Sequence, residues 1–380
     1  MRDEEDRQKH SGSHSVSSPL LTSTSEFDFI NKLRREVETR AGSASFIPQP
    51  SSLVRGIGDD AAVFQPSPNR DVLVSTDLLV EDVDFRRETT PPDLLGHKAL
   101  AVSLSDIAAM GAQPRWALLS IGVPDPVWNS GFLDSFYAGF LKLATRYSVT
   151  LIGGDVSRTP DKVVIDSILI GETSKAGAVF RSGAEPGDQI FVTGFLGDAA
   201  AGLRLLERGA RLPPPTQPPR LDSRQPGERH RLDYLLLRQL RPEPRVGWGL
   251  LLGEQKLATA MIDISDGLSS DLNHLCTESN VGALVDSGAI PIDPLVTELT
   301  GRRALDPLML ALHGGEDFEL LFTVKPEMVT KLPTRVDGVS LTRIGEIKEA
   351  SHGVRISEGS RTWNLEPGGW EHFKGGMGEK

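Results

Sequence analysis

Apolar residues recur at helical spacing near the start of the structured part of the chain, and short apolar runs follow. Phe27, Ile30, Leu33 and Val37 fall on one face of a predicted helix that begins at about residue 26. Apolar runs predict strands at 72–74, 116–123, 149–152 and 163–170. Helical periodicity is found between these runs, at 93–110 and 132–147. The first part of the chain therefore alternates strands and helices.

A turn signal, Pro186-Gly187-Asp188, opens a second part with the same alternation. Strands are predicted at 189–193, 283–285 and 318–324, and a helix rich in Ala and Leu follows Gly197. The proline-rich stretch 212–231 is expected to be a surface insertion, because prolines at this density prevent regular hydrogen bonding. Hairpin-like pairs of strands favour a mixed α+β architecture over a doubly wound parallel sheet.

Chain length and local composition set the expected domain boundaries. A chain of 380 residues is longer than one core usually serves, so two domains are expected. We predict a disordered Ser-rich tail at 1–25, an N-terminal domain at 26–178, a C-terminal domain at 179–373 that contains the insertion 212–231, and a short tail at 374–380.

Composition excludes several classes of protein. The net charge of −11 argues against a nucleic-acid binder, which would present a basic surface. No run of eighteen apolar residues occurs, so no membrane span is expected, and the first 25 residues lack the apolar centre of a secretory signal. The expected location is cytoplasmic. The single cysteine, Cys276, allows neither an internal disulfide nor a cysteine-based zinc site and is expected to be buried.

Asp residues recur beside Gly, Ser or Thr at predicted strand ends and turns, and one lies on a small apolar helical face. The segments are Gly56-Ile57-Gly58-Asp59-Asp60, Ser75-Thr76-Asp77, Ser105-Asp106, Gly153-Gly154-Asp155, Asp263-Ile264-Ser265-Asp266 and Gly314-Gly315-Glu316-Asp317. Magnesium takes oxygen ligands and bridges phosphates, so its sites draw on scattered single carboxylates. The pattern therefore predicts several Mg²⁺ ions together with phosphate groups.

Each acidic segment also has an ordinary structural interpretation. Asp59 and Asp60 could cap a turn instead of binding a cation, and Asp106 could lie on a helix surface that faces water. Gly153-Gly154-Asp155 fits a turn, and Asp266 is well placed to cap a helix that begins near Gly267. Capping explains Asp263 poorly, because an extended backbone would place it on the same side as Ser265.

Other phosphate-binding and catalytic motifs are absent from the sequence. Residues 56–61 fit the loose pattern G-x-G-x-x-A, but two carboxylates would stand where a dinucleotide's pyrophosphate should bind. The chain has no Walker A sequence, no H-R-D, no nucleophile elbow and no H-E-x-x-H. Any use of nucleotide is therefore of another design, and hydrolase functions lack support.

Taken together, the motifs resemble those of the bacterial thiamine-monophosphate kinases. The resemblance rests on Gly56-Ile57-Gly58-Asp59-Asp60-Ala61-Ala62, Ser75-Thr76-Asp77, the segment from Leu104 to Ala112, Ile152-Gly153-Gly154-Asp155, Asp263-Ile264-Ser265-Asp266-Gly267-Leu268 and Gly314-Gly315-Glu316-Asp317-Phe318-Glu319-Leu320. It covers residues 26–373 in the same order. The implied fold has two α/β halves of the aminoimidazole-ribonucleotide synthase-like type, with mixed sheets packed with helices, and the implied assembly is a homodimer formed through the N-terminal halves.

The resemblance also implies roles for individual residues. Metal ligands would be Asp60, Ser75, Thr76, Asp77, Asp106, Asp155, Asp263 and Asp266. ATP contacts would be Gly154, Asp155, Arg181, Ser265 and Tyr137. Substrate contacts would be Asp84, Glu316 and Trp370. A guanidinium such as that of Arg181 suits a polyphosphate, although a surface salt bridge is its alternative role.

The implied reaction transfers the γ-phosphoryl group of ATP directly to thiamine monophosphate with the help of several Mg²⁺ ions, without a general base. Two alternatives stay open at this point: another ATP-dependent reaction of the same superfamily, such as that of aminoimidazole-ribonucleotide synthase, and a non-catalytic scaffold that binds metal or nucleotide. Selenophosphate synthetase and the hydrogenase maturation dehydratase are disfavoured, because the reactive cysteines expected of them have no counterpart here.

Overall fold

The computed structural model describes residues 26–43, 53–57, 61–213, 228–301 and 306–370. The first part of the chain forms a four-stranded mixed sheet with the order β3-β6-β4-β5. Its strands are β3 (Arg70–Val80), β4 (Gln113–Val123), β5 (Thr150–Arg158) and β6 (Val164–Ser174). β6 is antiparallel to β3 and β4, whereas β4 and β5 are parallel. A separate small sheet joins β1 (Leu53–Arg55) to β2 (Val63–Phe64).

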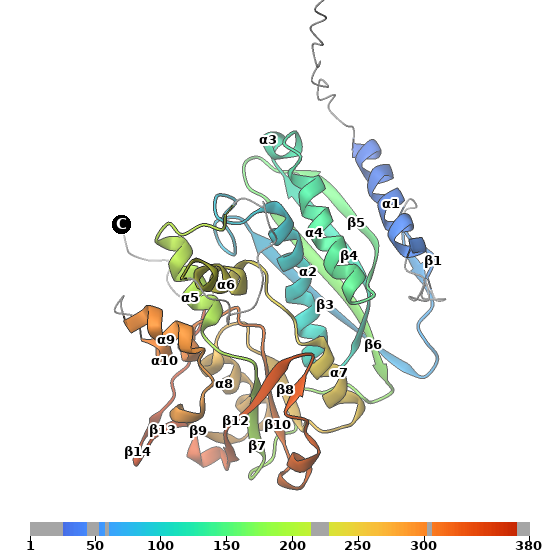
Figure 1. Ribbon diagram of the computed structural model, residues 1–380. Coiled ribbons are helices and arrows are strands. Elements are labelled where there is room, and N and C mark those ends of the chain that lie inside the picture. Colours follow the sequence, from blue (N-terminus) through green and yellow to red (C-terminus); the bar gives the residue numbers. More distant parts are fainter. Residues whose placement is uncertain (1–25, 44–52, 58–60, 214–227, 302–305, 371–380) are drawn as a thin grey trace, which may run out of the picture.

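Helices cover one face of the four-stranded sheet (Figure 1). They are α1 (Glu26–Ser43), α2 (Pro92–Ala109), α3 (Asp125–Trp128) and α4 (Phe132–Arg146). Helices α2 and α4 pack so closely that a Cβ atom on Gly139 would lie 1.8 Å from the carbonyl oxygen of Asp93. Because of this packing, and because other elements cover its remaining faces, α2 is buried along most of its length, lysine and serine side chains included.

The opposite face of the same sheet is covered in part by the small β1–β2 sheet, where Phe64 stacks on Trp116, and is open along β3 in the single chain. Side chains alternate along β3, so Ser75, Asp77 and Leu79 point toward the helices, while Val74 and Leu78 point outward. Val74 is 66% exposed and Leu78 is 58% exposed. Thr76 lies between them on the same face, so the open part carries polar as well as apolar side chains.

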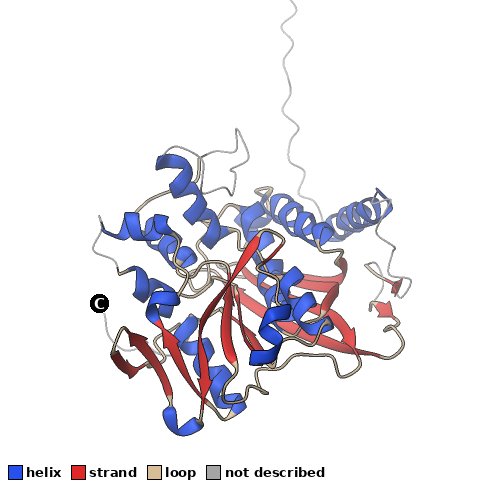
Figure 2. Ribbon diagram, turned by 60° about the horizontal axis from the view of Figure 1, so that its bottom comes forward, coloured by secondary structure: helices blue, strands red, loops and turns tan. Residues whose placement is uncertain are grey.

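The second part of the chain forms an eight-stranded mixed sheet with the order β14-β13-β9-β12-β7-β10-β8, and β11 pairs with β12 off this path. The strands are β7 (Gln189–Thr193), β8 (Ala260–Asp263), β9 (Gly282–Asp286), β10 (Leu320–Val324), β11 (Arg335–Val336), β12 (Val339–Lys348), β13 (Val354–Glu358) and β14 (Arg361–Asn364). The β9–β13 pair is parallel and the remaining pairs are antiparallel. Figure 2 shows the strands of both sheets with helices packed against them.

The helices of the second part are α5 (Asp198–Glu207), α6 (Glu228–Leu240), α7 (Val246–Glu254), α8 (Leu268–Ser279), α9 (Pro294–Gly301) and α10 (Pro307–His313), with 3₁₀ turns at Ser287–Ala289, Pro326–Lys331 and Ala350–His352. Alternation along the strands separates two cores. Phe191 and Phe322 face the first half together with Trp248 of α7, while Ile190 and Val192 belong to a second core with α8. No helix among the described residues is long and apolar enough to cross a membrane.

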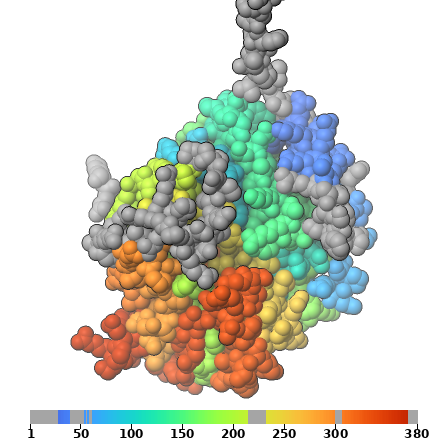
Figure 3. All heavy atoms as spheres, in the orientation of Figure 1, coloured from blue at the N-terminus to red at the C-terminus, as the bar shows by residue number. Residues whose placement is uncertain are grey.

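Helix α2 lies between the two halves and joins them. On its far side it meets α7, where a Cβ atom on Gly249 would lie 2.2 Å from the carbonyl oxygen of Ala108. A Cβ atom on Gly253 would lie 2.6 Å from the carbonyl oxygen of Gly111. These glycines let the two helices touch through their backbones. Figure 3 shows the result: the blue-to-teal and orange-to-red parts of the chain form two contiguous blocks in contact.

The structure confirms the mixed α+β architecture and the predicted helices and strands of both parts, with three corrections. Ser75-Thr76-Asp77 does not end a strand, because β3 continues to Val80 in register with β6. Gly153-Gly154-Asp155 is not a turn but the middle of β5, with a bulge opposite Ala117 and Leu118. The last predicted strand begins at Leu320 rather than residue 318, because Phe318 has φ +50°.

Two predicted features fall partly or wholly outside the described residues. The expected tails, 1–25 and 374–380, lie outside them, as does most of the expected insertion. Residues 228–231, at the end of the expected insertion, belong to α6, and the bounds of the insertion stay a prediction. The domain boundary expected near residue 178 stays a prediction; the chain passes from the first sheet to the second between Ser174 and Gln189.

Candidate active site

The C-terminal part of α2 gathers three carboxylates from both halves of the molecule. The Ser103 hydroxyl donates a 2.7 Å hydrogen bond to Asp77 Oδ2 of β3, and the Ser105 hydroxyl donates one of 2.7 Å to Asp263 Oδ2 at the end of β8. The third carboxylate, Asp106, accepts a hydrogen bond from the Ser75 hydroxyl. Asp77, Asp106 and Asp263 are called the α2 carboxylates below.

The α2 carboxylates lack enough positive charge around them. Burial raises the pKa of Asp77 to about 7, and the neighbouring charges of Asp106 and Asp166 add to this rise. Burial likewise raises the pKa of Asp263 to about 7, with contributions from Asp106 and Asp77. The pKa of Asp106 is raised by burial, while Ser75 and Arg181 act in the opposite direction. An added cation would lower these pKa values and favour the ionised carboxylates.

The donor set fits magnesium in chemistry. The side chains that meet are carboxylates and hydroxyls, which are hard oxygen ligands, and no sulfur or imidazole takes part. In the part of the chain that the structure describes, no three acidic, histidine or cysteine side chains converge closely enough to enclose an ion. These oxygen donors could hold a metal ion only if water or phosphate completed its coordination.

A second group of predicted residues meets at three loops beside Asp263. Ser265 and Asp266 lie between β8 and α8, and the Glu316 amide donates a 2.7 Å hydrogen bond to the Ser265 carbonyl. The Trp370 amide donates a 3.1 Å hydrogen bond to the Asp266 carbonyl, so the backbone of Trp370 lies at this loop, and its side chain is exposed. The helix cap at this point is Gly267 rather than Asp266, and the Asp271 carboxylate accepts from both backbone amides.

Thr76 and Asp155 lie apart from the α2 carboxylates within one chain. Register pairs Asp155 with Ser120, Ser120 with Asp166 and Asp166 with Leu78, so Asp155 shares the open face of the sheet with Leu78. Thr76 points to the same face and donates a 2.7 Å hydrogen bond to Asp166 Oδ1. Gly154 belongs to this edge strand and has φ +154°. The expected ligand set is therefore split between two faces of the sheet.

Two further predicted residues, Asp84 and Tyr137, have surroundings that do not join them to the rest. Asp84 Oδ2 accepts a 2.8 Å hydrogen bond from the Val80 amide in the loop after β3. The Tyr137 ring packs edge-on against Phe29 and Phe136 and is 3% exposed, so in this conformation it offers no surface to a nucleotide. Asp60 lies outside the described residues.

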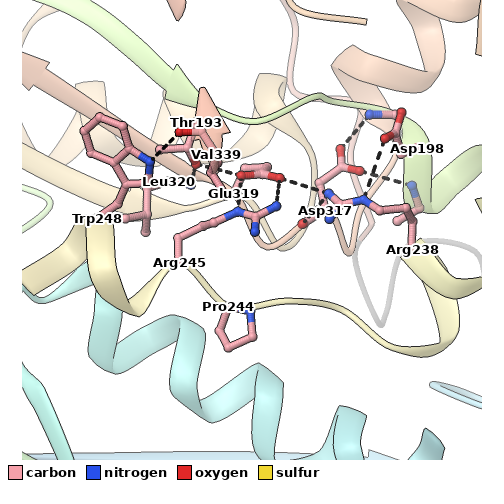
Figure 4. A network of polar contacts seen from close by, with 12 residues as sticks. Thr193, Asp198, Arg238, Pro244, Arg245, Trp248, Asp317, Glu319, Leu320 and Val339 are labelled. Atoms are coloured by element: carbon pink, nitrogen blue, oxygen red, sulfur yellow. Dashed lines mark hydrogen bonds and ion pairs between the residues drawn. The ribbon is translucent and has the colours of Figure 1, made fainter. Parts of the chain in front are cut away.

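A different polar network holds the base of the Glu316 loop (Figure 4). Glu319 is completely buried and accepts hydrogen bonds from two guanidinium groups. Arg238 donates at 2.9 Å, and Arg245 Nε lies 2.5 Å from Glu319 Oε2. The Thr193 hydroxyl donates a further 2.7 Å hydrogen bond to Glu319. Asp317 accepts from the Gly197 amide at 2.7 Å and so anchors the start of α5. Here the protein itself supplies the cations.

Two family models match most of the chain. The AIR synthase related protein N-terminal domain matches residues 58–173, and the AIR synthase related protein C-terminal domain matches residues 185–357. The thiamine-monophosphate kinase of Bacillus subtilis (strain 168) is 38% identical over 328 residues, which cover 85% of this chain and 95% of that protein. The chain belongs to the thiamine-monophosphate kinase family.

Solved structures of the thiamine-monophosphate kinase family have the same fold. The enzyme from Stenotrophomonas maltophilia K279a has a TM-score of 0.72 at 37% identity, covering 86% of this chain and 95% of that one. AaThiL complexed with AMPPCP and TMP has a TM-score of 0.68 at 30% identity, covering 94% of this chain and 100% of that one. These matches confirm the expected two-part architecture.

The structure adds residues to the site that the family motifs did not lead us to select. Ser103 and Ser105 orient two of the α2 carboxylates, and Lys98, on the same helix, pairs with Glu316. The signal was present: hydroxyl and ammonium groups on a helix that is otherwise apolar on every side must find buried partners. Gln239 carried no such signal, because a glutamine in the largely polar helix α6 gives no indication that it is buried.

Proposed function

We propose that this chain transfers the γ-phosphoryl group of ATP to the phosphate of thiamine monophosphate, giving thiamine diphosphate and ADP. The observation that carries the proposal is the gathering of Asp77, Asp106 and Asp263 around α2, beside Arg181. Two relatives support it. One is the thiamine-monophosphate kinase of Bacillus subtilis, and the other is AaThiL, whose structure contains AMPPCP, an ATP analogue, together with TMP.

Several Mg²⁺ ions are proposed as cofactors. The α2 carboxylates and Ser75 would hold them on one side of β3, and the remaining proposed ligands are Asp60, Thr76, Asp155 and Asp266. When bound, the ions supply positive charge that offsets the repulsion between two anionic substrates. Because the protein supplies the carboxylates and the ions supply the positive charge, an acidic protein can act on polyanions.

The chain's own residues position the two substrates. Arg181 is exposed and close enough to lower the pKa of Asp106 and Asp263, so its guanidinium is available to a polyphosphate at the same place. Gly154, Asp155 and Ser265 are proposed as further ATP contacts, and Glu316, Trp370 and Asp84 as contacts to the acceptor. The acceptor phosphate is already ionised at neutral pH, so transfer is proposed to be direct and in line, without a general base.

A homodimer is proposed through the open face of the first sheet. Exposed Val74 and Leu78 supply the apolar surface, and a second chain would cover it. Because Asp155 and Thr76 share this face, their contribution is proposed to depend on the dimer. Leu78→Glu should shift the sedimentation coefficient from that of a dimer to that of a monomer. If wild type already sediments as a monomer at every accessible concentration, this part of the proposal is refuted.

The function is tested by incubating the protein with ATP, Mg²⁺ and thiamine monophosphate and separating the products. Thiamine diphosphate and ADP should form in equal amounts. Formylglycinamidine ribonucleotide replaces the acceptor in a parallel reaction, which distinguishes the synthase activity of the wider superfamily. Folded protein that produces no thiamine diphosphate would disprove the proposal.

A further inference from the structure

The side chain of Glu316 is held from two sides by buried donors. The Lys98 ammonium lies 2.5 Å from Glu316 Oε1, and the Gln239 amide nitrogen donates a hydrogen bond to Oε2. Lys98 is 2% exposed and Gln239 is 5% exposed, whereas the Glu316 side chain keeps 29% of its surface open. Two groups that no solvent reaches thus fix a carboxylate that a ligand can reach.

The two donors come from separate parts of the fold. Lys98 belongs to α2 in the first half, Gln239 belongs to α6, and Glu316 lies in the loop between α10 and β10. Lys98 and Ser105 are seven residues apart, which is two helical turns, so one face of α2 contacts both Glu316 and Asp263. The distance along the helix between these two positions is about 10 Å. The same rigid element therefore sets the metal end and the Glu316 end of the site.

The backbone of the Glu316 loop is also held in an uncommon conformation. Glu316 has φ +66° and Phe318 has φ +50°, values that non-glycine residues rarely adopt. Their amides are fixed by hydrogen bonds to the carbonyls of Ser265 and Ile264, at 2.7 and 2.9 Å. Arg238, the neighbour of Gln239 on α6, donates to Glu319 at the end of the same loop (Figure 4). Strain that persists under so many contacts is typical of functional loops.

A count of lone pairs shows what the clamped carboxylate can still bind. Each oxygen of Glu316 can accept two hydrogen bonds, and one is used on each side. In addition, Gln239 Oε1 is buried and has no hydrogen-bond partner among the described residues. The site therefore has unused hydrogen-bond acceptors and a carboxylate. These groups would suit a ligand with a hydrogen-bond donor, such as the amino group of an aminopyrimidine, or with a cationic heterocycle.

We propose that Lys98 and Gln239 are positioning residues that aim Glu316 at the amino group and cationic ring system of the acceptor substrate. This inference rests on the proposed function, because thiamine monophosphate carries both features. Neither residue is required to touch ATP. The clamp should therefore set the affinity for the acceptor and leave the affinity for nucleotide unchanged.

The test is direct binding of thiamine monophosphate, measured by isothermal titration calorimetry without nucleotide, to wild type, Lys98→Met, Gln239→Leu and Glu316→Gln. Each variant should bind the acceptor roughly tenfold or more weakly, as expected when a charge-assisted contact is lost. Binding of AMPPCP with Mg²⁺ should stay within about twofold of wild type, as for distant, independent sites. Lys325→Met, which removes an exposed ion pair with Glu185, is the matched control and should change neither affinity.

A double variant separates positioning from direct contact. If Lys98 acts through Glu316, Lys98→Met should weaken acceptor binding no further once Glu316→Gln is present. Additive losses, or equal losses for acceptor and nucleotide, would overturn the inference. Lys98→Arg should retain most of the affinity for the acceptor. If circular dichroism shows that Lys98→Met does not fold, the acceptor affinity of Gln239→Leu is used to test the inference instead.

Wild-type measurements keep the two proposals apart. If wild type binds and phosphorylates thiamine monophosphate while the clamp variants bind it normally, only the clamp is wrong. If folded wild type does neither, the proposed function itself fails.

Discussion

Two buried acidic regions of this protein are built on opposite principles. In the network of Figure 4, Glu319 is enclosed by two guanidinium groups and a hydroxyl from the same chain. Around α2, Asp77 and Asp263 receive one serine hydrogen bond each and repel one another and Asp106. A carboxylate matched by the protein's own cations serves the fold, whereas carboxylates left without them are arranged for a cation that arrives later.

Removing a carboxylate from the α2 region should produce the largest change, and in activity rather than stability. Asp77→Asn keeps the shape and the Ser103 contact but removes the charge that would hold Mg²⁺. We expect kcat/KM to fall about 10³-fold, the scale of a lost electrostatic group in a catalytic site. Urea unfolding of the metal-free variant should show stability equal to or above wild type, because a buried charge has been removed.

The exposed Asp125, 3.4 Å from Arg158 on the surface of the same half, supplies the control. Asp125→Asn should leave activity and stability unchanged. An active Asp77→Asn variant would show that the α2 carboxylates do not hold the reacting metal.

Removing the carboxylate of the Figure 4 network should have the reverse effect. Glu319→Gln leaves Arg238 and Arg245 buried with less than a full counter-charge. We expect a loss of about 3 kcal/mol in the free energy of unfolding, as for a broken buried pair. Glu185→Gln, which breaks the exposed pair with Lys325, should give no measurable change in the same urea titration. If Glu319→Gln unfolds like wild type, the network is not what holds this part of the fold.

Sequence patterns predicted the helices and strands, and of the two acidic regions they predicted the α2 carboxylates. Residues 93–110 are rich in Ala and Leu, which favour helices, so α2 was predictable within a residue of its bounds. The acidic motifs identified Asp77, Asp106 and Asp263, which do meet. The pattern could not show that β3 and β5 run on through Asp77 and Asp155, because the alternation of exposed and buried positions there includes polar residues on both faces.

Long-range pairing is what the sequence could not supply. Ser105 and Asp263 are 158 residues apart, and Arg245 and Glu319 are 74 apart, so no local spacing relates them. The sequence alone therefore could not distinguish acidic residues that stabilise the fold from those available to a ligand. Only the structure separates Asp317 and Glu319, which stabilise the loop, from Glu316 in the same motif, which stays partly open.

Stability measured against pH and Mg²⁺ sharpens the comparison further. Asp77 and Asp263 have pKa values raised to about 7 in the folded protein, above the ordinary value near 4 of the unfolded chain. The folded state then binds more protons than the unfolded state between those values, so stability of the metal-free protein should fall as pH rises from about 4 to about 7. Asp198 and Asp317 of the other region, raised by burial to about 7 and about 8, contribute in the same direction.

Mg²⁺ separates the two contributions, because it should bind only the α2 carboxylates and only when they are ionised. The rise in thermal midpoint on adding Mg²⁺, relative to EDTA, should be small near pH 5.5 and several degrees near pH 8, as expected for about 2 kcal/mol of linked binding. Asp77→Asn should abolish most of this rise, and Glu319→Gln should preserve it. An equal rise at both pH values would contradict the assignment.

The smallest expected effect concerns the serines of α2, which separate the two regions at the level of single hydrogen bonds. Ser105→Ala removes the donor to Asp263 and leaves the carboxylate in place, so the metal should still bind but with a less well-oriented ligand. A hydrogen bond of about 1 kcal/mol corresponds to a roughly fivefold rise in the Mg²⁺ concentration at half-maximal thermal stabilisation. Ser103→Ala should act alike through Asp77, and Thr193→Val, which removes a donor to Glu319, should lower stability without moving the Mg²⁺ dependence. Equal Mg²⁺ midpoints for all three variants would mean that the two regions differ in charge balance alone and not in how their carboxylates are held for a ligand.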